Sequence, residues 1–156
     1  MNKLYNQSKT WLQQCVTGIA WLCLAYPVMA LDNPDATNRL ATFETREQVH
    51  RQAVNHPDNT TLDTLRTYAD YEAFLTTELA QAYQFLQTRL GATEQHALQQ
   101  AQCRWETYRD AEIVMIQQTW TRAQFGSSFA LSRGMYRTSL IRARIIQLIL
   151  YANNYL

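Results

Sequence analysis

Residues 65–86, with the sequence LRTYADYEAFLTTELAQAYQFL, decide the fold class of this chain. Their apolar side chains recur at alternating spacings of three and four residues, and only Glu72 interrupts the series. This period puts the side chains on one face, which predicts a long helix with a buried stripe. Arg89-Leu90-Gly91 follows, and we expect Gly91 to end the helix in the left-handed cap position. The stripe consists of Leu65, Tyr68, Glu72, Leu75, Leu79, Ala82 and Leu86.

Two later segments repeat this period. One helix is predicted from about Thr93 to Trp120, and another from about Phe129 to Asn153. The first stripe consists of Leu98, Ala101, Trp105, Tyr108, Glu112 and Met115, and the second of Met135, Ile141, Ile145, Leu148 and Ile149. No segment alternates as a strand would, and only four glycines and three prolines punctuate the chain. The sequence therefore predicts an all-α fold, an antiparallel three- to four-helix bundle.

Residues 31–60 are more polar. They contain a weak helical pattern from about Ala36 to Val54, which a turn at residues 56–59 closes. Two interpretations stay open for this segment: a helix loosely docked on the bundle, or a mobile arm.

The second predicted helix contains the stretch WETYRDAE, residues 105–112. At 3.6 residues per turn, Trp105, Tyr108 and Glu112 fall on one face, with Arg109 beside them. A surface helix does not ordinarily put aromatic and ionisable side chains on the same stripe. The stretch is therefore either a buried polar network or a recognition surface.

This stretch resembles the core motif of the LprI-like family of lysozyme inhibitors, small exported bacterial domains. The similarity extends from about residue 65 to 150. The flanking matches are Leu79, Tyr83, Leu86 and Leu90, then Leu98, Ala101 and Gln102, then Gly126-Ser127, and finally Arg144-Ile145 through Leu148. The resemblance implies a helical domain that binds lysozyme and catalyses nothing.

The chain departs from the family pattern at four positions. Ile113 and, by spacing, Tyr136 stand where family members commonly carry cysteines, which implies that a family disulfide is lost here. Ala80 replaces an asparagine, and Phe125 replaces the first glycine of a Gly-Gly-Ser loop.

The first thirty residues are typical of a secretory signal peptide. Lys3 and Lys9 precede an apolar stretch from residue 15 to 24, and Pro27 precedes Val28-Met29-Ala30. We predict cleavage after Ala30 and a periplasmic or secreted protein, because the apolar run is too short for an uncleaved membrane anchor. The expected domains are the signal peptide (1–30), the polar segment (31–60) and an LprI-like helical domain (61–156).

After cleavage the chain is almost neutral. Both lysines are lost, and twelve arginines face thirteen acidic residues. Such a chain has no basic field for nucleic acid or an anionic membrane. Cys103 is then the sole cysteine, so no internal disulfide can form; we expect either a half-buried small side chain or a thiol open to intermolecular pairing. The three histidines lack metal-ligand spacing, and no cofactor or metal is predicted.

Glu72 and Glu112 occupy predicted core positions, where an unpaired carboxylate would be costly. Arginine partners are expected from Arg109, Arg142 or Arg144, and Arg109→Ala should cost on the order of 3 kcal/mol if the site is buried. We favour a structural ion-pair network over a ligand-binding cleft, and a slim bundle is a poor host for glycosidase chemistry. The predicted network comprises Glu72, Trp105, Tyr108, Arg109, Asp110, Glu112 and Arg144.

The predicted loop after the second helix offers a different kind of site. Trp120, Phe125, Gly126 and Ser127 lie where the helical period has ended, and exposed loop aromatics can anchor a protein partner. The leading hypothesis is an exported, non-enzymatic interaction domain that inhibits lysozyme. The alternative is a periplasmic structural or envelope-assembly module that binds a protein through its first helix, although for that charged surface we favour a solvated face. The first-helix residues concerned are Arg39, Glu44, Arg46, Glu47 and Arg51.

Overall fold

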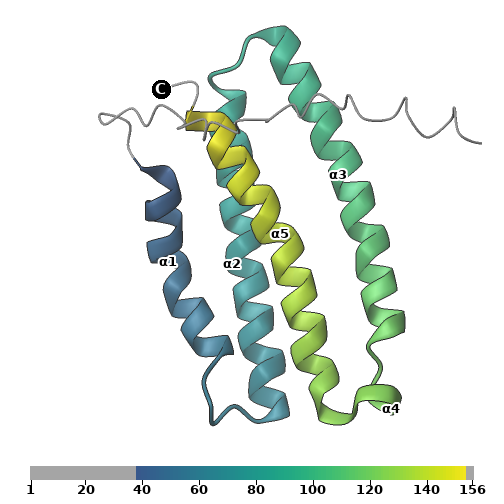
Figure 1. Cartoon of the computed structure of the whole chain (residues 1–156). Helices are drawn as coiled ribbons and strands as arrows, with labels where there is room; N and C mark the ends of the chain where they lie inside the picture. The colour runs from purple at the N-terminus through teal and green to yellow at the C-terminus, as the bar shows by residue number, and fades with distance from the viewer. Residues whose placement is uncertain (1–37, 154–156) are drawn as a thin grey trace, which may run out of the picture. The chain divides into compact units, whose positions relative to one another are not determined.

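The computed structural model of the chain describes residues 38–153, and these belong to one compact unit (Figure 1). The helices are α1 (Arg39–Val54), α2 (Thr61–Gln87), α3 (Ala92–Thr119), α4 (Arg122–Phe125), a 3₁₀ turn η1 (Gly126–Ser128) and α5 (Phe129–Asn153). No strand occurs between residues 38 and 153. The predicted all-α antiparallel bundle is confirmed. The signal peptide and its cleavage after Ala30 lie outside the described residues.

The long helices begin and end at recognisable signals. Asn38 caps α1 by accepting a hydrogen bond from the Ala41 amide at 2.9 Å. Thr60 and Asp63 form a reciprocal capping box at the start of α2. The expectation for Gly91 is wrong, because its φ is −69° and it precedes α3 as the N-cap. The helix α2 already ends at Gln87, and the turn that follows needs no left-handed residue.

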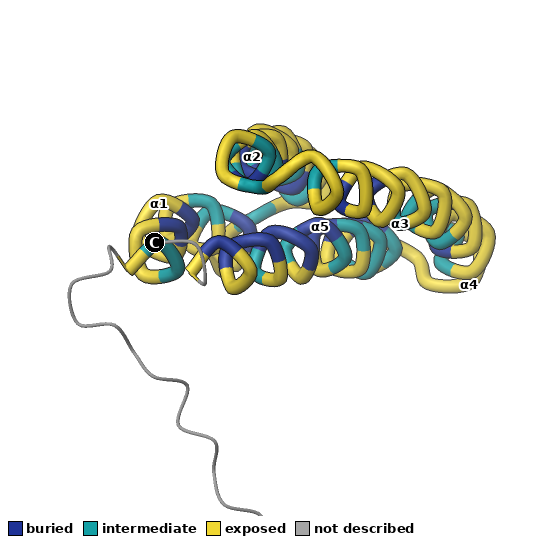
Figure 2. Tube along the Cα trace, turned by 90° about the horizontal axis from the view of Figure 1, so that it is seen from above, coloured by how far each residue is buried: buried dark blue, intermediate teal, exposed yellow. Residues whose placement is uncertain are grey.

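Seen along the helices, α1, α5 and α3 form a row, and α2 lies beside this row and packs against α1 and α5 (Figure 2). The most extensive packing is between α2 and α5. The helix α3 leaves α2 at a short turn and diverges from it toward its own C-terminus (Figure 1). It therefore packs less closely than the other long helices.

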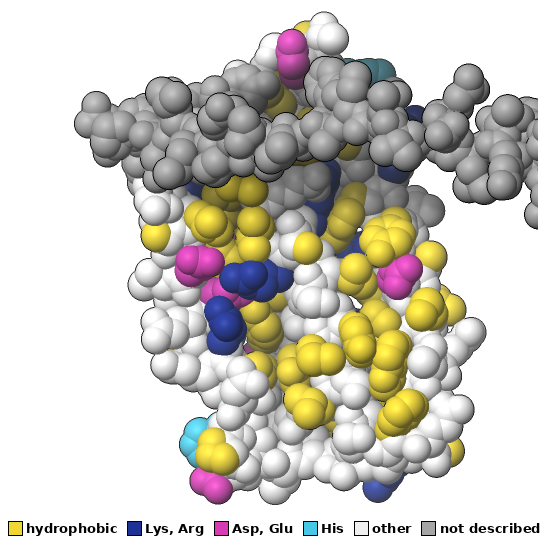
Figure 3. All heavy atoms as spheres, in the orientation of Figure 1, with side chains coloured by type: hydrophobic (Ala, Val, Ile, Leu, Met, Phe, Trp, Pro, Cys, Tyr) yellow, Lys and Arg dark blue, Asp and Glu magenta, His cyan; other side chains and the backbone are white. Residues whose placement is uncertain are grey.

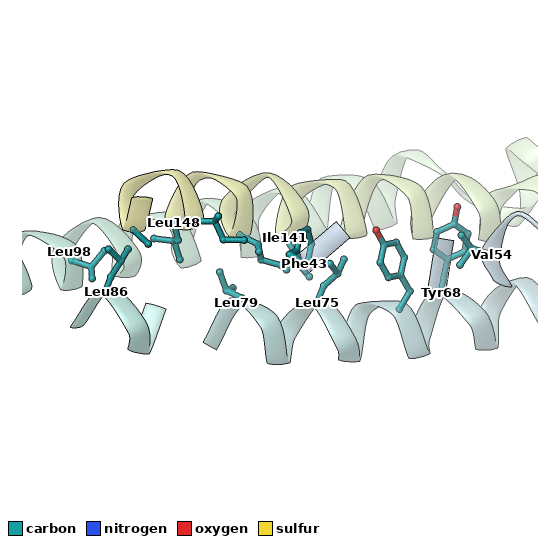
Figure 4. Close-up of a cluster of buried hydrophobic side chains, with 13 residues drawn as sticks. Phe43, Val54, Tyr68, Leu75, Leu79, Leu86, Leu98, Ile141 and Leu148 are labelled. Atoms are coloured by element: carbon teal, nitrogen blue, oxygen red, sulfur yellow. The ribbon is translucent and has the colours of Figure 1, made fainter. Parts of the chain in front are cut away.

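The core lies between α1, α2 and α5 (Figure 4). Phe43, Leu75, Ile145 and Leu148 are 0% exposed. Each such side chain contributes roughly 1.5–3 kcal/mol by leaving water. The α2 stripe is confirmed at Tyr68, Leu75, Leu79 and Leu86, while its first residue, Leu65, is exposed.

The first helix is an integral layer of this core. Phe43 and Glu47, one turn apart on α1, are both 0% exposed. The ring of Phe43 stacks 6.3 Å from that of Phe74 on α2. The structure therefore contradicts both interpretations of this helix, the loosely docked helix and the mobile arm.

Candidate functional site

The motif helix α3 turns a different face to the bundle than its apolar pattern predicts. Leu98, Gln102 and Ile116 are buried, and Trp105 and Arg109 are half-buried. These positions recur at three and four residues, like the predicted stripe, and both stripes pass through Leu98 and Trp105. At the other positions the two stripes differ by one residue, which is about 100° around the helix, so the centres of the two faces lie about 60° apart.

The predicted core assignment is consequently wrong for half of that stripe. Tyr108 and Met115 are each 52% exposed, and Ala101 is exposed as well. Gln102 takes the inward direction because it accepts a hydrogen bond from Arg144 there, and Arg109 is half-buried beside the Trp105 ring. Hydrophobicity alone cannot anticipate such contacts.

Arg109 lies beside Trp105 and bonds to its own neighbour. Its Nε and Nη2 donate to Oδ1 of Asp110 at 2.9 and 2.8 Å, and its guanidinium lies 5.2 Å from the Trp105 ring centre. The side chain of Asp110 is 65% exposed. Arg109 therefore compensates neither Glu72 nor Glu112, contrary to the prediction.

Because of this geometry, we expect Arg109→Ala to have only a small effect on stability. Its pair with Asp110 is largely solvated, and such pairs contribute about 1 kcal/mol or less. We expect the free energy of unfolding to fall by about 1 kcal/mol, mainly from lost packing on Trp105. Urea denaturation followed by helical circular dichroism measures it. A loss of several kcal/mol would mean that Arg109 compensates a buried carboxylate after all.

Arg144 occupies the inward side of the same region. It is 7% exposed, its Nε donates to Gln102 at 3.1 Å, and its Nη1 donates to Gln147 at 2.6 Å. Its guanidinium also lies 5.9 Å from the Trp105 ring centre. Burial lowers the pKa of Arg144. Arg144 thus joins α5 to α3 through the amide of Gln102 rather than through a carboxylate.

The two predicted buried carboxylates have different surroundings. Glu72 pairs with Arg137 at 2.7 Å, with both side chains partly exposed. Glu112 is half-buried and has no ion pair among residues 38–153. The predicted residues therefore do not form one network. Trp105, Arg109, Asp110 and Arg144 are brought together, whereas Tyr108 is exposed and Glu72 belongs to another contact.

The buried carboxylates that the sequence analysis missed are Glu47 and Glu78. Glu47 accepts hydrogen bonds from Arg142 Nε at 2.8 and 3.1 Å and from the Tyr71 hydroxyl. Burial, together with the bond to Glu47, raises the pKa of Tyr71 well above its usual range. Glu78 accepts from Arg46 Nε and Nη2 at 2.8 and 2.6 Å.

These pairs correct the interpretation of α1 as a solvated face at Arg46 and Glu47. The signal for Glu47 was its place four residues after Phe43, on the same side of the helix. Since Arg142 stabilises Glu47, its assignment to Glu72 or Glu112 is also wrong.

The predicted loop after α3 is a compact turn made of α4 and η1. Arg133 fixes its start by donating to the carbonyls of Gln117 and Trp120, both at 2.6 Å. The ring of Trp120 packs 4.4 Å from that of Tyr136 on α5. Gly126 has a φ of +56°, which a side chain would strain.

Among the predicted loop residues, Phe125 is the exposed aromatic one. It is 43% exposed at the end of α4, and Ser127 beside it is exposed too. Trp120 is half-buried against the bundle and so belongs to the support of the turn. The turn therefore presents Phe125 from a fixed backbone.

Two shallow grooves flank α3. One lies against α2, and the other lies against α5; each has a volume of about 450 Å³. Between residues 38 and 153, no three His, Cys, Asp or Glu side chains cluster as metal ligands would. Cys103 is an exposed free thiol beside the α2 groove.

Residues 53–148 match the family model described as lysozyme inhibitor LprI. The chain belongs to this family. The matched part of the LprI family member runs from the last turn of α1 into α5 and contains α3 and the α4–η1 turn. No curated protein and no solved structure matches it. None of the helices between residues 38 and 153 has the length and apolar character that a membrane crossing needs.

Proposed function

We propose that this LprI family member is an exported, non-enzymatic domain that inhibits lysozyme. The observation that carries the proposal is the rigid turn that presents Phe125. An exposed aromatic side chain on a fixed backbone loses little freedom on binding, and such residues dominate protein interfaces. The family match supplies the class of partner.

The proposal assigns different roles to the predicted loop residues. Phe125 is the contact residue, and Ser127 beside it offers a hydroxyl at the same tip. Gly126 gives the turn its positive φ, and Trp120 holds the turn against Tyr136. The motif residues Trp105, Arg109, Asp110 and Arg144 serve as scaffold that joins α3 to α5.

Export is part of the proposal. Residues 1–30 act as a signal peptide that is removed after Ala30, and the protein works in the periplasm or outside the cell. Residues 31–60 then precede the LprI-like domain of residues 61–156 and contribute α1 to its core. Mass spectrometry of the protein recovered from the cell envelope fraction tests the cleavage site.

The decisive measurement is lysis of a peptidoglycan suspension by C-type lysozyme with increasing inhibitor. We expect saturable inhibition by the wild-type protein. Phe125→Ser should weaken inhibition by about 30-fold or more, the effect of removing a central aromatic contact. Because Phe125 is exposed, the substitution should leave the melting temperature almost unchanged.

Val114→Ser is the matched control, since Val114 is comparably exposed, at 52% against 43% for Phe125, and lies on α3 rather than in the turn. It should inhibit like the wild type. Full inhibition by folded Phe125→Ser would contradict the role of the turn. No inhibition by folded wild-type protein would contradict the lysozyme proposal and favour the envelope-module alternative.

A further inference from the structure

The turn that presents Phe125 carries charge of one sign. Arg122 is the first residue of α4, and it is exposed. Between Glu112 and Arg133 the sequence contains no other charged residue. The proposed contact turn is therefore basic, and it has no carboxylate of its own.

The two arginines at the turn differ in what they bind. Arg133 donates to the carbonyls of Gln117 and Trp120, and these bonds hold the start of the turn. Arg122 has no ion pair within residues 38–153, and its guanidinium makes no hydrogen bond to a described residue. The side chain of Arg122 is thus available to a partner, whereas that of Arg133 serves the fold.

Arg122 also lies close to the aromatic contact residue. It precedes Phe125 by three residues on α4, and side chains at this spacing are neighbours on a helix, with Cβ atoms about 5–6 Å apart. Residues 122–128 are all exposed, at the end of the bundle where α3 leads into α5 (Figure 1). On the face drawn in Figure 3, a basic side chain lies at the lower edge near α4, and the acidic side chains lie farther away. The turn therefore presents an aromatic ring and a cation side by side.

Lysozyme, the partner in the proposed function, offers a matching pair of features in its catalytic cleft. A retaining glycosidase places two carboxyl groups about 5–5.5 Å apart around the scissile bond, and the nucleophilic carboxylate of lysozyme stays ionised. A planar guanidinium is well suited to such oxygens because it can donate two parallel hydrogen bonds. The rest of a ligand cleft is mostly apolar, which suits an aromatic ring.

We propose that Arg122 enters the lysozyme cleft and donates hydrogen bonds to its catalytic carboxylates, while Phe125 packs on the apolar lining beside them. This inference rests on the proposed function and deepens it, because it names the part of the enzyme that the turn binds. An acidic residue in the turn would be repelled by the same carboxylates, and none lies between Glu112 and Arg133. On an enzyme surface without acidic groups, Arg122 would contribute nothing to binding.

The first test is the affinity for C-type lysozyme, measured by isothermal titration calorimetry with protein expressed from the full sequence and recovered as the cell processes it. Arg122→Gln should raise the dissociation constant about 30-fold, because the enzyme carboxylates lose their partner inside the interface. Arg122→Lys keeps the charge but not the paired donors, so its dissociation constant should lie between those of the wild type and Arg122→Gln. Arg122 is exposed, so neither change should alter the melting temperature.

Arg104→Gln is the matched control. Arg104 is exposed in the middle of α3 and, like Arg122, has no ion pair with any described residue. The substitution changes the net charge by the same amount, so it reports any effect of overall charge on binding. It should bind lysozyme like the wild type.

The second test changes the enzyme. In a lysozyme variant whose two catalytic carboxyl groups are replaced by amides, Arg122 has no anion to bind. The wild-type inhibitor should bind this variant about 30-fold more weakly than native lysozyme, and Arg122→Gln should bind both enzymes about equally. Such a double-mutant cycle isolates the contact between Arg122 and the carboxylates.

The outcomes separate this inference from the proposed function. If wild type and Arg122→Gln bind native lysozyme equally well and both inhibit it, the role of Arg122 is overturned and the proposed function stands. The same conclusion follows if Arg122→Gln weakens binding to the amide variant as much as binding to the native enzyme. No binding of native lysozyme by folded wild-type protein would overturn both.

Discussion

Replacing Arg142 by alanine should lower the free energy of unfolding by about 3–5 kcal/mol, which is the usual cost of leaving a buried charge without its partner. Glu47 is 0% exposed, and Arg142 supplies two of its hydrogen bonds. Without Arg142 the Tyr71 hydroxyl remains as a donor but cannot neutralise the charge. The carboxylate must then take up a proton or open the core to water. Urea denaturation at neutral pH measures the loss.

Arg137→Ala is the matched control. Arg137 also lies on α5 and binds a glutamate, Glu72, at 2.7 Å, but the two side chains are 34% and 26% exposed. Partly solvated pairs contribute about 1 kcal/mol or less, so this variant should stay close to the wild type.

Replacing both charged partners separates the cost of an orphaned charge from the contribution of the pair. Glu47→Met combined with Arg142→Met should be much less destabilising than Arg142→Ala alone, because no buried charge remains. Equal losses in the Arg142→Ala and Arg137→Ala variants would contradict the account of a buried Glu47.

The sequence was sufficient for the long helices and for the apolar faces of α2 and α5. Their period is carried by large aliphatic residues such as Leu75, Leu79, Ile145 and Leu148, whose burial outweighs every other contribution. The predicted last helix has the observed bounds, Phe129–Asn153. Here hydrophobic burial and helical period point to the same face, so the pattern identifies it.

On α3 the pattern could not identify the inward face. Its two competing stripes share Leu98 and Trp105, and the difference in hydrophobicity favours the one with Tyr108 and Met115. The observed orientation instead buries Gln102, which accepts from Arg144 and donates to Glu106 at 3.1 Å. A choice made by hydrogen bonds between helices depends on the partner helix, which a single segment does not specify.

In the first helix, the sequence likewise could not show which charged residue is buried. Glu47 and Arg51 look alike in the sequence, as ionisable residues of a polar helix, yet Glu47 is buried and Arg51 is exposed. What separates them is a cation ninety-five positions away, Arg142. The same limit applies to the candidate site. The end of the helical period located the loop, but the sequence did not predict that Arg133 supports it.

Gly134→Ala should also cost about 3 kcal/mol, at the upper end for an added methyl group in a close-packed core. Gly134 is buried on α5, and a Cβ there would overlap the ring of Tyr68 on α2. In an exposed helix the same change would be favourable by about 1 kcal/mol, so helix propensity predicts the opposite sign. The expected loss therefore measures how closely α2 and α5 approach each other. Thermal and urea denaturation should both show it.

A double variant and a control variant identify the cause of that loss of stability. In a Tyr68→Ala protein the ring is absent, so adding Gly134→Ala should cost almost nothing, and the coupling between the two sites should reach about 3 kcal/mol. Gly91→Ala is the matched glycine control, because a Cβ there would meet only the movable carboxylate of Glu94, at 2.7 Å from its Oε2. A Gly134→Ala protein as stable as Gly91→Ala would mean that α5 can shift away from Tyr68 without loss. The packing of α2 against α5 would then contribute less to stability than its contacts indicate.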